Sequence, residues 1–131
     1  MRSSVSTLVV VSGPAGCGKT TLAHRLARAL ACPAICRDEI KEGMARTAND
    51  YLPEAGDELA RRTLSTFFDV LRLLVERGTT VVAEAAFQDH VWTPNLAPLA
   101  AFSEFRVVQC HTDPATASRR VAEHAATRRV H

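Results

Sequence analysis

The chain has 131 residues, a length that predicts one compact domain spanning residues 1–131. Apolar residues make up 47% of the chain and charged residues 23%, so the sequence can build a hydrophobic core and is not that of a disordered protein. Sixteen Lys and Arg against 14 Asp and Glu give a net charge of +2, well below the basic excess of a nucleic-acid scaffold.

The first half of the chain predicts two strands and two helices. Thr7 to Val11 is an almost wholly apolar, β-branched run, typical of a strand that is buried on both faces of a parallel sheet. A glycine-rich turn follows, and then a helix whose leucines recur at four-residue spacing until Pro33 ends it. Ala34 to Cys36 forms a short second strand, and another short helix begins in the charged segment that starts at Arg37.

The second half repeats this alternation. Apolar residues that step by three and four predict a long helix from Asp57 to about Glu76, stopped by Gly78. The remaining elements are two strands, Thr79–Ala83 and Phe105–Cys110, and two helices that open with a cap residue and a proline, one at Thr93-Pro94 through Leu99 and one at Asp113-Pro114 to about Thr127.

Strands separated by helices imply right-handed crossovers and therefore a three-layer α/β/α fold with a mainly parallel sheet. The segment from Ala45 to Gly56 is the least periodic part of the chain, and we expect a mobile loop there, near the functional site.

A phosphate-binding motif lies between the first strand and the first helix. Gly13-Pro14-Ala15-Gly16-Cys17-Gly18-Lys19-Thr20 matches the P-loop pattern G-x-x-x-x-G-K-[ST]. In such a loop the backbone N–H groups hold phosphate oxygens, Lys19 reaches the outer phosphates and the Thr20 hydroxyl completes the shell of a phosphate-bound Mg²⁺. The motif, extended to Thr21, therefore predicts a nucleoside-triphosphate site, with a chance glycine-rich turn as the alternative.

Polar side chains at the ends of the second and third strands are candidates for the rest of the site, because ligands of open α/β sheets bind at the carboxyl ends of strands. Asp38 is placed to take a proton from a substrate hydroxyl and Arg37 to orient that substrate, although Asp38 also suits a helix cap. Glu84 follows an apolar run, as expected of an acid that holds Mg²⁺. A basic cluster, Arg119, Arg120, Arg128 and Arg129, either closes over the phosphates or is a solvated helix face.

The four cysteines, Cys17, Cys32, Cys36 and Cys110, form no Cys-x-x-Cys pair and have no histidine at zinc-finger spacing, so we expect reduced thiols. The longest early apolar run, Leu8 to Val11, is too short for a signal peptide or a membrane span. We therefore expect a cytoplasmic protein with no membrane partner.

The chain resembles the P-loop kinases of the polynucleotide-kinase and chloramphenicol-phosphotransferase type, a group of AAA-like predicted kinases. The resemblance rests on Leu8–Thr21, Cys36–Lys41, Val81–Phe87 and Val107–Asp113 followed by Arg119-Arg120. It implies that Asp38 is the general base with Arg37 beside it, that Glu84 is the acid after the third strand, and that lid arginines lie among residues such as Arg120 and Arg128. Such kinases normally continue into a fifth strand and a final helix, so the fold is expected to lack these two elements, since the sequence ends at His131.

Together these features predict an ATP- and Mg²⁺-dependent phosphotransferase that moves the γ-phosphate to a hydroxyl of a small molecule. A nucleic-acid end is a second, less favoured acceptor. The near-neutral charge disfavours a nucleic-acid scaffold, although a kinase that acts on ends would need only a narrow basic groove. The alternative is an ATP-binding module, or a truncated P-loop protein, without transferase activity.

Overall fold

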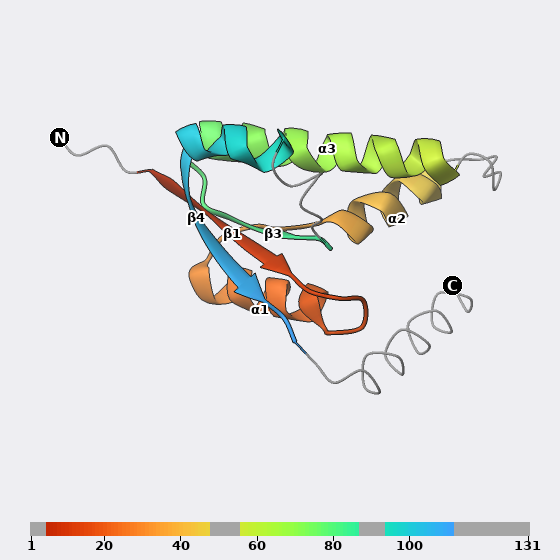
Figure 1. Cartoon of the computed structure of the whole chain (residues 1–131), viewed down its shortest axis with the longest axis horizontal. Helices are drawn as coiled ribbons and strands as arrows, with labels where there is room; N and C mark the ends of the chain where they lie inside the picture. The colour runs from red at the N-terminus through yellow and green to blue at the C-terminus, as the bar shows by residue number, and fades with distance from the viewer. Residues whose placement is uncertain (1–4, 48–55, 87–93, 112–131) are drawn as a thin grey trace.

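Four parallel strands form the central sheet of the computed structural model, which describes residues 5–47, 56–86 and 94–111 (Figure 1). The strands are β1 (Ser6–Ser12), β2 (Ala34–Cys36), β3 (Val81–Glu84) and β4 (Ser103–Gln109). They lie in the order β2-β3-β1-β4, and every pairing between neighbours is parallel. The predicted parallel sheet is therefore confirmed.

Helices cover both faces of this sheet. Helix α1 (Lys19–Leu30) lies on one face, and the long helix α3 (Gly56–Glu76) lies on the other together with the short 3-10 helix η2 (Ala97–Ala101), as Figure 1 shows. Helix α2 (Arg37–Thr47) follows β2 directly and contacts α3. The predicted three-layer α/β/α architecture is confirmed.

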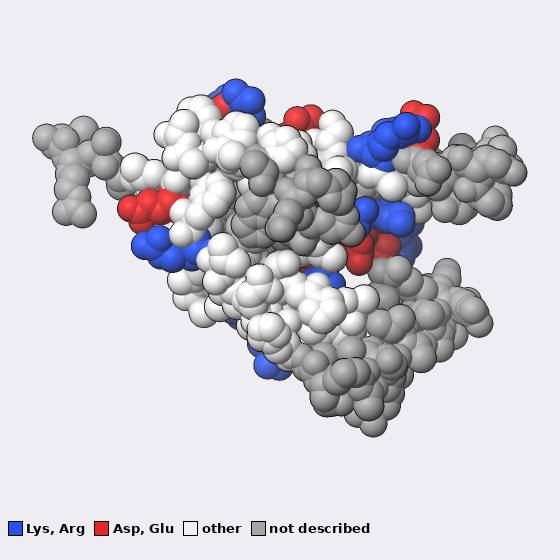
Figure 2. All heavy atoms as spheres, in the orientation of Figure 1, with Lys and Arg blue, Asp and Glu red and all other residues white. Residues whose placement is uncertain are grey.

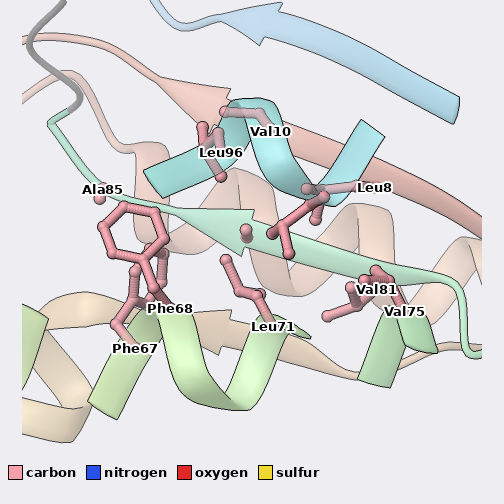
Figure 3. Close-up of a cluster of buried hydrophobic side chains, with 11 residues drawn as sticks. Leu8, Val10, Phe67, Phe68, Leu71, Val75, Val81, Ala85 and Leu96 are labelled. Atoms are coloured by element: carbon pink, nitrogen blue, oxygen red, sulfur yellow. The ribbon is translucent and has the colours of Figure 1, made fainter. Parts of the chain in front are cut away.

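Burial of both faces of β1 explains why its sequence is apolar without alternation. Leu8 and Val10 point toward α3 and join the cluster drawn in Figure 3, which includes Phe67 and Leu71. Val9 and Val11 point the opposite way and pack against α1. Because successive side chains of a strand face opposite sides, a strand between two helix layers needs apolar residues at every position.

Pairing across the sheet moves two strand boundaries from the predicted positions. β4 begins at Ser103 rather than Phe105 because its ladder with β1 starts at Ser6 opposite Ser103. β3 begins at Val81 rather than Thr79, since the backbone N–H of Thr7 donates to the Thr80 hydroxyl at 3.1 Å instead of to the strand backbone. Composition alone does not reveal such partners.

The helices also differ from the prediction in part. Residues 45–47 belong to α2, so the predicted loop between residues 45 and 56 is shorter, and 48–55 lie outside the described residues. Residues 94–96 make one helical turn that continues as the 3-10 helix η2, where a single helix was predicted. The helix predicted for 113–127 also lies outside the described residues.

The charged surface is mixed. On the face shown in Figure 2, basic and acidic groups lie beside one another in small groups, with uncharged surface between them. On the described part of this face no broad basic area appears, in keeping with the net charge of +2. Within the three described ranges, none of the helices combines the length and apolar character that a membrane crossing needs.

Helix α1 ends at Leu30, three residues before Pro33, because Ala31 adopts a left-handed conformation with φ 55°. The Ala31 N–H donates to the Arg28 carbonyl at 3.2 Å, and the Cys32 N–H donates to the Ala27 carbonyl at 2.9 Å. This hydrogen-bonded ending usually has glycine at the left-handed position. α3 follows that rule, since Gly78 takes φ 75° just after its end.

We expect Ala31→Gly to stabilise the protein by about 1 kcal/mol, or ~3 °C in Tm, because glycine removes the steric cost of the left-handed conformation. The matched control is Ala29→Gly, two residues earlier at an exposed position in the last turn of α1, which should destabilise by up to about 1 kcal/mol. Thermal unfolding followed by circular dichroism measures both. Two shifts of the same sign would contradict this account of the helix end.

Candidate functional site

The carboxyl ends of three strands meet beside the loop that joins β1 to α1. Val82 of β3 packs on the α1 side of the sheet, so Glu84, two residues later, faces the same side. In the sheet register Glu84 lies opposite Val11 of β1 and Cys36 of β2. The third and second strands therefore present a carboxylate and a thiol to α1 at adjacent positions.

Glycines shape the loop at residues 13–18. Gly16 and Gly18 have φ values of 82° and 88°, in the left-handed region that glycine enters without steric cost. Gly13 is required for a different reason: a Cβ there would lie 2.6 Å from the Cys110 carbonyl oxygen and 2.7 Å from Cys17 Sγ. The loop backbone therefore packs directly against the end of β4, where the Cys110 thiol also donates to the Cys17 carbonyl at 2.8 Å.

The N-terminus of α1 combines several features that favour an anion. Gly18 occupies the cap position, and the first turn holds no acidic side chain. Lys19 is the first residue of the helix, so its positive charge adds to the partial charge of the helix N-terminus. Uncapped amides next to a lysine are the features by which helix ends bind phosphate.

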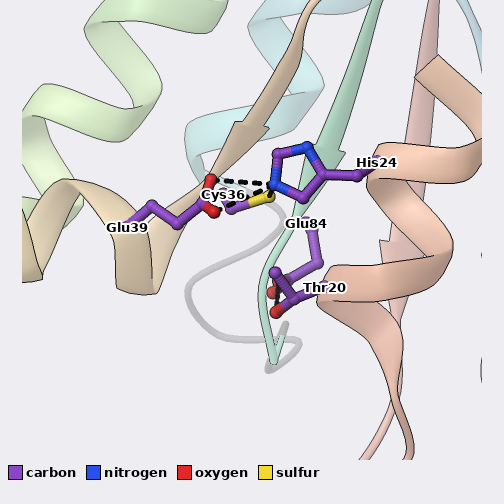
Figure 4. Close-up of polar contacts among 5 residues, drawn as sticks. All are labelled: Thr20, His24, Cys36, Glu39 and Glu84. Carbon is purple, nitrogen blue, oxygen red and sulfur yellow. Dashed lines mark hydrogen bonds and ion pairs between the residues drawn. The ribbon is translucent and has the colours of Figure 1, made fainter. Parts of the chain in front are cut away.

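Thr20 and Glu84 are in direct contact, as Figure 4 shows. The Thr20 hydroxyl donates to Glu84 Oε1 at 2.5 Å, and Glu84 is only 1% exposed. Burial raises the pKa of Glu84 above its usual value, although the Thr20 hydrogen bond and the charge of Lys19 partly offset this effect. A hydroxyl and a carboxylate at this distance form the oxygen donor set that suits Mg²⁺, so the residues present fit that ion.

Arg37 and Asp38 lie in the first turn of α2, just beyond the end of β2. Because α2 begins at Arg37, Asp38 is inside the helix and the cap alternative is wrong. Its carboxylate lies 3.9 Å from Arg37 Nη1, and half of its side chain is exposed. The buried Arg37 Nε has no hydrogen-bond partner among the residues that the structure describes. An unpaired buried donor is costly, so this N–H is suited to donate to a ligand oxygen.

The structure thus brings Lys19, Thr20 and Glu84 together and places Arg37 and Asp38 beyond the next strand. Of the other residues predicted to hold the nucleotide, Cys17 is 4% exposed and fills space behind the loop, whereas Pro14, Ala15 and Thr21 are exposed. Arg120 and Arg128, with Arg119 and Arg129, lie outside the described residues.

A second group of polar side chains was not predicted from the sequence. His24 of α1, Cys36 of β2 and Glu39 of α2 converge one helical turn beyond Thr20 (Figure 4). His24 Nε2 lies 2.9 Å from Glu39 Oε2 and 3.7 Å from Cys36 Sγ. Burial and the nearby carboxylates of Glu39 and Glu84 raise the pKa of the Cys36 thiol. The sequence contains two signals of this group. His24 is four residues after Thr20, on the same face of the helix, and Glu39 is three residues after Cys36.

All four cysteines are free in the structure, and reduced thiols stay the expectation. Cys36 and Cys110 are nevertheless placed in polar surroundings, the first beside His24 and the second beneath the loop.

We expect Gly13→Ala to destabilise the protein by about 1–3 kcal/mol, because its Cβ would overlap the Cys110 carbonyl oxygen and the Cys17 sulfur. Gly43→Ala is the matched control: nothing lies within 4 Å of a Cβ there, and alanine in the α2 interior should stabilise by up to about 1 kcal/mol. Chemical denaturation of the two variants and the parent measures both values. Equal stability of Gly13→Ala and the parent would show that the loop is not packed as described.

Glu84→Gln should raise the stability of the nucleotide-free protein near pH 7 by on the order of 1 kcal/mol, because it removes the cost of burying an ionised carboxylate. Active sites commonly keep groups that lower stability in this way. The folded-state pKa of Glu84 lies above its ordinary value of 4.5, so the stability it contributes is fully present below pH 4.5 and is lost as the pH rises through the folded pKa. The advantage of the variant should therefore disappear below pH 4.5. Thermal unfolding as a function of pH measures it, with exposed Glu104→Gln as the control. A variant less stable than the parent at pH 7 would contradict the raised pKa.

Three solved structures illustrate the fold similarity. A protein from Chloroflexus aurantiacus proposed to be a kinase superposes with a TM-score of 0.83 at 22% identity, covering 94% of this chain and 69% of that one. The APS kinase of Mycobacterium tuberculosis, in complex with AMPPNP and APS, gives a TM-score of 0.67 at 19% identity, with 94% and 72% covered.

A chain of the Pnkp1/Rnl/Hen1 RNA repair complex gives a TM-score of 0.69 at 12% identity over 96% of this chain and 40% of that one. The chain thus spans less than half the length of this last relative. None of the curated protein sequences compared with the chain matches it significantly.

These likenesses, all below 25% identity, establish a shared fold. The family itself follows from the sequence: the family model described as AAA domain matches residues 8–131, from β1 to the end of the chain. The family relationship supports a phosphotransferase-like function in general, and the chain belongs to the AAA-domain family of P-loop, kinase-like proteins.

Proposed function

We propose that the chain is a Mg²⁺- and ATP-dependent phosphotransferase that moves the γ-phosphate of ATP to an acceptor hydroxyl. The observation that carries this proposal is the contact between the Thr20 hydroxyl and the buried Glu84 carboxylate, directly beside Lys19 and the glycine loop. A binding loop that only held phosphate would not need a carboxylate buried at its edge. A carboxylate next to a phosphate site is explained by a cation that accompanies the phosphates.

The nucleotide would bind with its phosphates against residues 13–20. The loop amides and the α1 N-terminus hold phosphate oxygens, and Lys19 neutralises charge on the outer phosphates. Thr20 and Glu84 would hold the Mg²⁺, which when bound neutralises charge that develops on the phosphates. The APS kinase that shares this fold was solved with AMPPNP, an observation that supports ATP as the nucleotide.

The acceptor hydroxyl would approach from the end of β2. Asp38 takes the proton of that hydroxyl while its oxygen forms a bond to the γ-phosphorus and the bond from phosphorus to the β-phosphate oxygen breaks, releasing ADP. The exposure of Asp38 leaves it accessible to an acceptor, and the unpaired Arg37 Nε is suited to an oxygen of that acceptor. Arg120 and Arg128 complete the proposal as lid residues that neutralise the transferring group.

The acceptor is proposed to be a small molecule. On the described part of the face in Figure 2, basic and acidic groups lie beside one another in small groups, which disfavours broad contact of this face with a nucleic-acid backbone. One neighbour was solved in complex with APS and another as part of an RNA repair complex, so small molecules and nucleic-acid ends both belong among the acceptors to be tested. A cytoplasmic location, where ATP is abundant, is part of the proposal.

Coupled ATP turnover measured over a panel of hydroxyl compounds and nucleic-acid ends tests the proposal. We expect one acceptor class to stimulate turnover. Asp38→Asn should lower the acceptor-dependent rate by about 10²–10⁴-fold while ATP still binds, because it removes only the proton acceptor. Lys19→Ala should lower kcat/KM by on the order of 10²-fold or more and weaken ATP binding, because it removes a phosphate contact.

The chain offers matched controls for both substitutions. Lys41→Ala changes the other lysine of the sequence, and Asp69→Asn changes an exposed aspartate on α3; both should retain parental rates. Full acceptor-dependent turnover by Asp38→Asn would show that Asp38 is not the general base. ATP binding with no turnover on any acceptor would instead favour a nucleotide-binding module.

A further inference from the structure

The side chains of His24, Cys36 and Glu39 form a compact cluster that the proposed transfer reaction does not use. Their ligand-type atoms all lie within 4.8 Å of one another (Figure 4). His24 Nε2 lies 2.9 Å and 3.1 Å from the two Glu39 oxygens and 3.7 Å from Cys36 Sγ. Three different elements, α1, β2 and α2, therefore direct a nitrogen, a sulfur and an oxygen toward one point.

The two distances from His24 Nε2 are close to those of a tetrahedral zinc site, and all the ligand atoms lie within 4.8 Å of one another. With a Zn–N bond of about 2.0 Å, a Zn–O bond of about 2.0 Å and a Zn–S bond of about 2.3 Å, tetrahedral ligands lie about 3.3 Å (N to O) and about 3.5 Å (N to S) apart. The distances from His24 Nε2 to Glu39 and to Cys36 are within a few tenths of an ångström of these values. Small side-chain rotations would bring all three atoms into the shell of one ion.

We propose that His24, Cys36 and Glu39 bind a Zn²⁺ ion at a site distinct from the Thr20–Glu84 pair. Three protein ligands leave the fourth tetrahedral position for water or another small ligand. On binding, the Cys36 thiol releases its proton to solvent and its sulfur bonds to the metal as the thiolate.

The donor types decide which ion each site takes. A thiolate, an imidazole and a carboxylate suit Zn²⁺, whereas Mg²⁺ prefers oxygen donors such as Thr20 and Glu84. The charge around the cluster favours a cation as well, because the carboxylates of Asp38 and Glu84 act on Cys36 in addition to Glu39. The oxygen donors thus lie at the turn of α1 that holds Thr20, and the mixed donors lie at the next turn, which holds His24.

A simple ion pair between His24 and Glu39 accounts for only part of the cluster. Both side chains are about half exposed, 48% and 50%, and an exposed pair of this kind contributes little to stability. It also leaves unexplained why the 2% exposed Cys36 directs its sulfur at the same imidazole nitrogen. A shared metal ion explains all three side chains.

Zinc at this place would join the first turn of α2 to α1. Cys36 immediately precedes Arg37 and Asp38, and Glu39 immediately follows them, so two ligands flank the residues proposed to receive the acceptor. A bound ion would therefore restrict the position of Asp38. It would also stabilise the folded protein, because the three ligands converge only in the folded chain.

The experiment is a titration of the whole, metal-free chain in the absence of nucleotide, with Zn²⁺ followed by calorimetry and Co²⁺ by absorption. Co²⁺ should give a thiolate charge-transfer band that saturates at one equivalent and that Zn²⁺ displaces. Cys36→Ser should abolish the band and weaken Zn²⁺ binding by on the order of 10²-fold, and His24→Gln and Glu39→Gln by at least ~10-fold each. Zn²⁺ should raise the Tm of the parent and shift that of Cys36→Ser much less.

Matched controls separate the cluster from other metal-binding side chains. Cys32→Ser, four residues before Cys36, and Glu42→Gln, one turn after Glu39 on α2, should keep the parental band and affinity. His24→Gln and Glu39→Gln lie at the half-exposed edge, so they test the site even where Cys36→Ser does not fold.

A Co²⁺ spectrum without a thiolate band, or parental Zn²⁺ affinity in both His24→Gln and Glu39→Gln, would overturn the proposal. Loss of the band in Cys32→Ser with retention in Cys36→Ser would overturn it too. Lys19→Ala should bind Zn²⁺ as the parent does. Failure of the zinc site is therefore distinguishable from failure of the proposed transferase, since neither titration contains a nucleotide.

Discussion

The burial of β1 on both faces is the constraint on which the site depends. Leu8 and Val10 anchor the strand to α3 while Val9 and Val11 anchor it to α1, so the strand has no freedom to slide or rotate. Its carboxyl end is therefore fixed relative to β3 and β4. The loop after it packs so tightly against Cys110 that position 13 has no space for a Cβ. The fixed position of β1 therefore also fixes the position of the α1 N-terminus that follows the loop.

Helix α1 places polar side chains against the ends of two strands because its turns match the spacing of the strands beneath it. Thr20 and His24, one turn apart, lie over neighbouring strands, and each meets the side chain that the sheet register presents there. Glu84 and Cys36 are themselves register partners. The pairing of hydroxyl with carboxylate, and of imidazole with thiol, is thus set by one helix crossing two adjacent strands.

The sequence was sufficient for what local patterns determine. The apolar runs and the glycine-rich motif located β1, the loop and α1, and the apolar run of the third strand placed Glu84 at its carboxyl end. Tertiary contacts decided the rest. The α1 end at Ala31, the β4 start at Ser103 and the convergence of His24 with Glu39 depend on partners that periodicity does not identify. His24 and Cys36 are 12 residues apart in the chain, and only the fold brings them together.

The electrostatics of the site favour a metal–nucleotide complex over a bare nucleotide. Burial raises the pKa of Glu84 most, and Asp38 and Glu39 add to this rise, whereas the Thr20 hydrogen bond and Lys19 act to lower the pKa. A triphosphate without a cation would add further negative charge beside these carboxylates and would be repelled. In the proposed complex, a divalent cation held by Thr20 and Glu84 would offset that repulsion, and the ionised carboxylate would then serve as a metal ligand. The buried acid that weakens the nucleotide-free protein is then the group that makes the proposed complex selective for a metal-bound substrate.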